Sequence, residues 1–148
     1  TDIIPNTVTD GRIEAEKMAF HNSCGNKRGS MSINPFADLP LSGNLQVMWN
    51  DGTPGDTIFF SFVSPIEGYF RLTGHFTSGP GFGSFSANLN ENQLSGDLSL
   101  FAAKREKKVI RFDKVYIKEG DNTISFIIKK DGRDNHLFGL DRIDLSQE

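Results

Sequence analysis

Cysteine is almost absent, since Cys24 is the only one in 148 residues. No internal disulfide can form, and a single thiol indicates no particular compartment. The three histidines, His21, His75 and His136, are scattered and lack the spacing of zinc ligands. The sequence also has no G-x-S-x-G elbow, no phosphate-binding loop and no evident base partner for Cys24. These absences argue against an enzyme and favour a non-catalytic function.

Long apolar runs and a basic character are also missing. No stretch approaches the ~20 apolar residues that cross a bilayer, so we expect no membrane span. The net charge of −3 gives no footprint of nucleic-acid binding. We interpret the one basic run, residues 104–108, as a solvated loop. No signal peptide is visible, which fits a processed chain or a piece of a longer protein.

Short segments of alternating apolar and polar residues, bounded by Gly, Pro, Asn and Asp, dominate the chain. This pattern predicts eight to ten strands, and thus an all-β fold: an antiparallel β-sandwich, or jelly roll, of two packed sheets. Thirteen Phe residues, which lack a polar group, should fill its core. We expect one module over residues 1–148, with an irregular lead-in over 1–11 and a long polar loop over 21–43. The predicted strands are 12–20, 45–49, 57–63, 69–76, 82–89, 93–101, 109–118, 122–129 and 138–145. The segment 109–118 fits one strand or two, because its inward face switches near Asp113, as a β-bulge would cause.

Five short motifs occur in a characteristic order. They are Glu-Ala-Glu at 14–16, Pro-Gly-Asp at 54–56, Gly-Tyr at 68–69, Gly-Asp-Asn-Thr-Ile at 120–124 and Leu-Asp at 140–141. In this order the chain resembles carbohydrate-binding modules of families 6 and 35, which are galactose-binding-like jelly rolls appended to bacterial glycoside hydrolases. The resemblance covers roughly residues 11–146. It implies a non-catalytic module that tethers a parent enzyme to a polysaccharide or glycan.

The resemblance also implies a structural calcium ion near the paired ends of the first and last strands. By position, its side-chain ligands would be Glu14, Glu16 and Asp141. Glu14 and Glu16 share one face of a strand, and Asp141 shares a face with Ile143 and Leu145. Carboxylates on an apolar face need compensation, which Ca²⁺ could give with loop carbonyls. Solvation at a sheet edge, or pairing with arginine, is the alternative.

A sugar site needs an aromatic surface and a few planar polar groups. Trp49 is the best ring by type, although its alternation with Val47 also fits a core position. Phe36 and Phe82 lie in or beside loops and could be exposed. Polar candidates near one end of the sandwich are Asn44, Asn135 and His136, although Asn135 could simply form an Asx turn.

The sequence leaves a second function open. The excess of phenylalanine also fits a structural β-sandwich that packs on a neighbouring catalytic domain and has no ligand of its own. For either function we expect a multimodular bacterial protein that works outside the cell, in the periplasm or at the cell surface. Binding to isolated glycans would separate the two.

Overall fold

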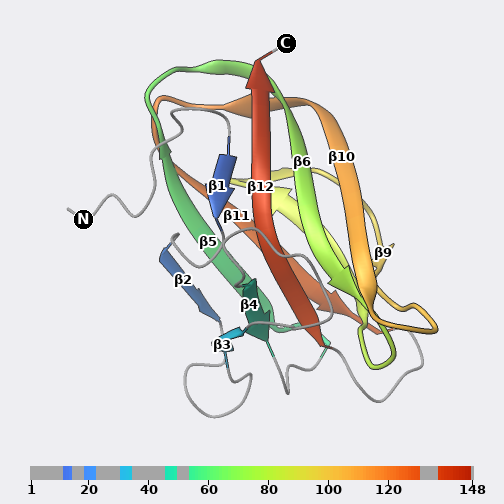
Figure 1. Cartoon of the computed structure of the whole chain (residues 1–148). Helices are drawn as coiled ribbons and strands as arrows, with labels where there is room; N and C mark the ends of the chain where they lie inside the picture. Colours follow the sequence, from blue (N-terminus) through green and yellow to red (C-terminus); the bar gives the residue numbers. More distant parts are fainter. Residues whose placement is uncertain are drawn as a thin grey trace.

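The computed structural model describes residues 12–14, 19–22, 31–34, 46–49, 54–130 and 137–147, which form strands and turns (Figure 1). Within these residues there is no helix, and thus none long and apolar enough to cross a membrane. The strands are β1 (Arg12–Glu14), β2 (Ala19–Asn22), β3 (Met31–Asn34), β4 (Gln46–Trp49), β5 (Thr57–Ser64), β6 (Gly68–Ser78), β7 (Ser84–Leu89), β8 (Asn92–Gln93), β9 (Leu98–Ser99), β10 (Glu106–Ile117), β11 (Gly120–Lys129) and β12 (Phe138–Gln147).

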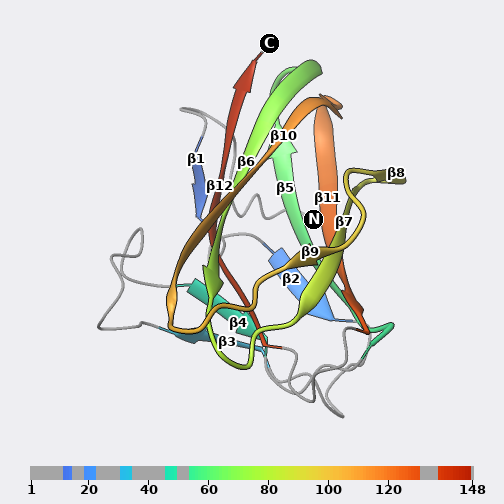
Figure 2. The same cartoon turned by 90° about the vertical axis from the view of Figure 1, so that its right-hand side faces the viewer.

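The strands form two antiparallel sheets that pack face to face (Figure 2). Sheet I has the order β10-β6-β12-β4-β3, and β1 also pairs with β12. Sheet II has the order β2-β5-β11-β7-β8, and β9 also pairs with β7. The expected all-β sandwich is therefore confirmed. β10 ends the order of sheet I and β8 ends the order of sheet II. Each of these two strands therefore has a neighbouring strand on one side only in this order.

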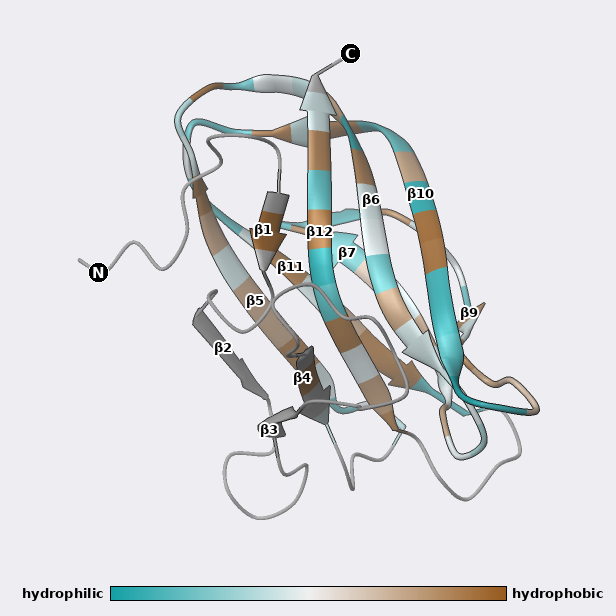
Figure 3. Cartoon of the chain, viewed as in Figure 1, coloured by the Kyte–Doolittle hydropathy of each residue, from teal (hydrophilic) through white to brown (hydrophobic). Residues whose placement is uncertain are grey.

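The core lies between the sheets, where alternate side chains of the long strands meet. The burial of β5 alternates strictly, and Figure 3 shows the matching bands of apolar and polar residues along the strands. Nine of the eleven phenylalanines whose burial the structure describes are buried, as the sequence predicted. Phe138 of sheet I packs against three rings of sheet II, with centroids 6.3 Å from Phe60, 4.8 Å from Phe85 and 5.0 Å from Phe126. These aromatic contacts join the two layers.

Four predicted segments were wrong in detail. The strand expected over 93–101 is two short strands, β8 and β9, each of which pairs separately with β7. The single strand expected over 12–20 is two strands, since β1 pairs with β12 in sheet I whereas β2 pairs with β5 in sheet II. The polar loop expected over 21–43 contains β3, which pairs with β4. The basic run at 104–108 is not only loop, because its last three residues begin β10. Short polar strands of this kind are stabilised by a neighbouring strand, which local sequence does not reveal.

The β-bulge predicted near Asp113 is confirmed. The pairing of β10 with β6 slips between Phe112 and Val115, and Lys114 there has a φ of 54°. One extra residue reverses the alternation of β10. Phe112 therefore points into the core, and Tyr116, four residues later, lies on the exposed side opposite Tyr69.

Candidate functional site

Two of the aromatic residues proposed for sugar binding belong to the core. Trp49 has no exposed surface, and Phe82 is 2% exposed. Trp49 lies on β4, directly opposite Phe138 in the register, so its ring joins the layer between the sheets. Phe82 precedes β7 and makes a bridge to Leu137. Neither ring offers a face on which a sugar could stack, so Trp49 takes the core position that its alternation with Val47 also allowed, and Phe82 is not exposed as expected.

Most of the other predicted residues lie outside the described part of the chain, namely Phe36, Asn44, Asn135, His136 and Glu16. Of the remaining metal candidates, Glu14 lies on β1 opposite Arg142 of β12. Asp141 is 1% exposed and occupies an irregularity where β12 slips against β6. The first and last strands thus bring the backbone of Glu14 beside Asp141. Among the described residues, no three His, Cys, Asp or Glu side chains form a group that could hold a metal ion.

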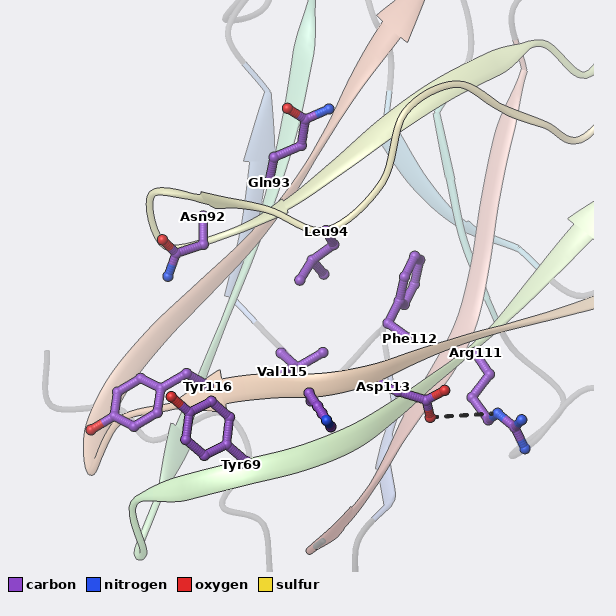
Figure 4. Close-up of a pocket in the computed structure, with 10 residues that line it drawn as sticks. Tyr69, Asn92, Gln93, Leu94, Arg111, Phe112, Asp113, Val115 and Tyr116 are labelled. Atoms are coloured by element: carbon purple, nitrogen blue, oxygen red, sulfur yellow. Dashed lines mark ion pairs between the residues drawn. The ribbon is translucent and has the colours of Figure 1, made fainter.

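A groove of about 480 Å³ lies where the open edges of the two sheets meet. Its walls come from β10 and the start of β6 on one side, and from β8 and the following residue on the other (Figure 4). The buried or half-buried Leu94, Phe112 and Val115 give it an apolar floor. The volume is within the range of small-ligand pockets. The remaining lining residues are Tyr69, Asn92, Gln93, Arg111, Asp113, Lys114 and Tyr116.

The aromatic part of the groove is a pair of tyrosines. Tyr69 of β6 and Tyr116 of β10 are directly opposite each other, with ring centroids 5.3 Å apart and an angle of 63° between the planes. They are 58% and 38% exposed. The Tyr116 hydroxyl donates a hydrogen bond to the Glu67 carboxylate, which fixes the ring. The edge-to-face arrangement leaves ring surface free to take an apolar ligand face.

Polar groups surround this pair. The Arg71 Nε atom lies 3.0 Å from Asp113 Oδ1, and the Arg111 Nε atom lies 3.7 Å from the same oxygen. One carboxylate therefore faces two guanidinium groups. On the opposite wall Asn92 is exposed, and the Gln93 side chain donates a hydrogen bond of 2.8 Å to the Ser95 carbonyl. Planar amides and guanidinium groups are suited to bind neighbouring hydroxyl groups.

A buried asparagine holds both walls of the groove. Asn122, which is 1% exposed, donates from Nδ2 to the carbonyls of Lys118 (2.9 Å) and Gly120 (3.1 Å). Its Oδ1 accepts from the Lys118 amide and from Asn90 Nδ2, both at 3.1 Å. Asn90, in the turn between β7 and β8, in turn accepts at 3.0 Å from the Thr123 amide. Asn122 thereby ties the β10–β11 hairpin to the turn that carries β8.

A second polar cluster lies on the outer face of sheet I. The His75 Nε2 atom is 2.9 Å from Asp144 Oδ2, and the Arg142 Nε atom is 3.3 Å from Asp144 Oδ1. Their side chains are between 13% and 35% exposed. The cluster joins β6 to β12, which are neighbours in the sheet. It therefore supports the sheet beside the groove.

Sequence reasoning missed the groove, although the sequence held one signal for it. Tyr69 and Tyr116 are the only tyrosines beside thirteen phenylalanines. Tyrosine combines an apolar ring with a polar hydroxyl group, so it suits a partly solvated site better than phenylalanine does. The opposite wall, Asn92 to Leu94, could not be matched to these tyrosines without the fold.

No family model matches the sequence, and no curated protein matches it. Solved structures do match. A xanthan lyase of Paenibacillus superposes with a TM-score of 0.74 at 14% identity, over 94% of this chain and 13% of the lyase. A family 35 carbohydrate-binding module from Clostridium thermocellum gives a TM-score of 0.60 at 12% identity, over 93% of this chain and 98% of the module. This chain has the fold of those modules.

The same fold forms part of longer enzymes. A GH26-CBM35 β-(1,4)-mannanase from Podospora anserina gives a TM-score of 0.63 at 17% identity, over 95% of this chain and 28% of the mannanase. The chain thus spans about a quarter or less of the two enzymes, but nearly the whole of the isolated Clostridium module. The expected likeness to the jelly-roll modules is confirmed at the level of fold.

Proposed function

We propose that this chain is a non-catalytic module that binds a polysaccharide or glycan in the groove between β10 and β8. The observation that carries the proposal is the exposed Tyr69–Tyr116 pair beside amide and charged side chains, in a fold shared with family 35 carbohydrate-binding modules. The rings would receive the C–H face of a sugar, and Asn92, Arg111 and Asp113 its hydroxyl groups. An open groove of this kind gives modest affinity, which further modules would raise through avidity.

We further propose that the module belongs to a longer, multimodular bacterial protein that acts outside the cell, in the periplasm or at the cell surface. The support is that the same fold occupies 13% of the Paenibacillus xanthan lyase and 28% of the Podospora mannanase. In such a protein the module would hold a neighbouring catalytic domain near its polymer. The chemistry would then belong to the neighbour.

Binding to a glycan panel tests the proposal. The similar structures suggest xanthan, β-1,4-mannan, β-1,3-galactan and isomaltooligosaccharides as probes, measured by affinity electrophoresis and calorimetry. Tyr69→Ala and Tyr116→Ala should each weaken binding by about tenfold, about 1.4 kcal/mol, because each removes an exposed ring. Phe101→Ala is the matched control, since this ring is 44% exposed but does not line the groove.

The alternative is a structural sandwich that packs on a neighbouring domain. It predicts that the isolated chain binds no glycan of the panel, and that exposed apolar residues such as Ile66 (45%) and Val109 (56%) become buried in the parent protein. If neither tyrosine substitution weakens binding but Phe101→Ala does, the binding site lies outside the groove.

We also propose a structural Ca²⁺ ion where the first strand meets the last. Asp141 is a buried carboxylate beside β1, and carboxylate and carbonyl oxygens are the ligands that Ca²⁺ prefers. Asp141 would hold the ion with Glu14 and Glu16, and the ion would fasten β1 to the sandwich. Calcium should then raise the melting temperature of the native chain and not that of Asp141→Asn. An unchanged melting curve in calcium and in EDTA would exclude the ion.

A further inference from the structure

Much of the positive charge of the chain is concentrated on β10 and the residues that flank it. Residues 104–118 contain seven Lys or Arg and two Glu or Asp, a net charge of +5. Because the whole chain carries −3, the other residues carry −8. The basic residues of this segment are Lys104, Arg105, Lys107, Lys108, Arg111, Lys114 and Lys118, all of them exposed. An anion would therefore be drawn to this segment rather than to the rest of the chain.

The fold presents these charges along the open edge of sheet I. β10 ends the order of the sheet, with β6 as its neighbour. Lys107 lies opposite Thr77 and Arg111 opposite Thr73, so both stand on the same outer face as the Tyr69–Tyr116 pair. At a rise of ~3.3 Å per residue, Lys107 and Arg111 are about 13 Å apart along the strand. The basic residues of β10 thus form an extended row, and a linear polymer has the same extended shape.

The basic row leads into the groove. Arg111 and Lys114 line it, and Lys107 continues the row beyond it. Inside the groove, Asp113 is the one acidic lining residue, and Arg71 and Arg111 both contact it. Glu67, which accepts a hydrogen bond from Tyr116, adds a second carboxylate beside the tyrosines. Arg71, Arg111 and Lys114 outnumber these two carboxylates, so the balance of charge there is positive.

Edge strands often carry lysine simply to prevent pairing with another sheet. That role requires only one or two charges and no particular relation to a pocket. Here the charges continue into a groove with two exposed aromatic rings, and the rest of the chain is acidic. The two roles also differ in their consequences, since removing protective charges promotes aggregation, whereas removing a ligand site lowers affinity.

We propose that the groove and the β10 edge together bind an anionic polysaccharide, one that carries carboxylate or sulfate groups. Its sugar rings would lie on Tyr69 and Tyr116, and its charges along Lys107, Arg111 and Lys114. This inference rests on the proposed function and adds the class of the glycan. The contacts are exposed, so the attraction is screened within ~8 Å at physiological ionic strength and must fall as salt rises.

The test compares charged polymers with neutral ones of the same backbone. Polygalacturonate and its carboxyl-reduced form probe carboxylates, and dextran sulfate and dextran probe sulfates. We expect at least one charged polymer to bind, its neutral form to bind at least about tenfold more weakly, and the affinity to fall as NaCl rises. Lys107→Gln/Arg111→Gln should lower the affinity for the charged polymer by about tenfold. Lys129→Gln/Lys130→Gln, on and after β11, removes the same charge elsewhere and should change it less than about twofold.

Four outcomes would overturn the inference. Equal binding of charged and neutral polymers, sensitive to Tyr69→Ala but not to Lys107→Gln/Arg111→Gln, would leave glycan binding intact and remove the preference for anions. An equal loss in the two double variants would indicate attraction by overall charge alone. Single-stranded DNA that binds as tightly as the polysaccharide would indicate a general polyanion surface. Failure of every polymer, charged or neutral, would overturn the proposed function as well.

Discussion

Replacing Asn122 should destabilise the fold and the groove together. Its side chain makes four hydrogen bonds, two donated to carbonyls and two accepted from N–H groups, and it is 1% exposed. Asn122→Ala removes all four and leaves partly buried groups of Lys118 and Gly120 without this partner. Unsatisfied buried groups cost about 1–3 kcal/mol each, but water can reach some of these, so we expect a total loss of about 2–3 kcal/mol. For a domain of this size that corresponds to a fall of about 4–12 °C in melting temperature.

Urea denaturation can be followed through Trp49, the only tryptophan, which is fully buried and must become exposed on unfolding. Asn92→Ala is the control for stability, because Asn92 is exposed and its loss should change the free energy of unfolding by less than about 0.5 kcal/mol. Asn122→Asp should be at least as damaging as Asn122→Ala, since a carboxylate would face two carbonyl oxygens. If the free energy of unfolding of Asn122→Ala is within about 0.5 kcal/mol of that of the native chain, the hydrogen-bond network does not hold the hairpin.

Substitutions at Phe138, Gly74 and Lys114 test the core and the bulge by the same denaturation assay. Phe138→Ala should lower the free energy of unfolding by about 3–5 kcal/mol, and a loss below about 1 kcal/mol would contradict its central place. Gly74→Ala should cost about 1–3 kcal/mol, because a Cβ there would lie 2.5 Å from the buried Phe76 ring, whereas Gly96→Ala has open space and should be nearly neutral. Lys114→Gly should stabilise by up to about 1 kcal/mol and Lys114→Val should destabilise, since φ is positive; the reverse order would refute the strain.

The long strands could be predicted from sequence because their burial has a period of two, as in the Ile58, Phe60 and Phe62 series of β5. The bulge could also be predicted, since apolar residues change parity between Phe112 and Val115. Short strands such as β3 could not, because a partner strand rather than their own composition stabilises them. Trp49 shows a different limit of prediction from sequence. Its residue type suggested a ring on which a ligand stacks, whereas its register on β4 places it in the core.

The candidate site was harder to predict because its parts come together only through topology. Asn92 and Tyr116 lie on strands that end different sheets, and the turn at Asn90 and the hairpin at Asn122 hold these ends together. Neither asparagine touches a ligand in our proposal, yet their hydrogen bonds join the elements that carry the two walls of the groove. A sequence search for binding residues selects exposed aromatic and charged types, and so it passes over such supports.

The position of the groove separates function from stability. The rings that join the two sheets, centred on Phe138, are fully buried, whereas Tyr116 and the basic residues of β10 stand on an open edge. Substitutions on the edge remove little buried area, so in our proposal they change the binding of a polymer without unfolding the sandwich. The extra residue at Lys114 makes this arrangement possible, because without it Tyr116 would take the parity of Phe112 and point inward. In our proposal the bulge thus turns the C-terminal part of β10 into a binding edge, and its deletion should abolish binding more completely than the loss of any one side chain there.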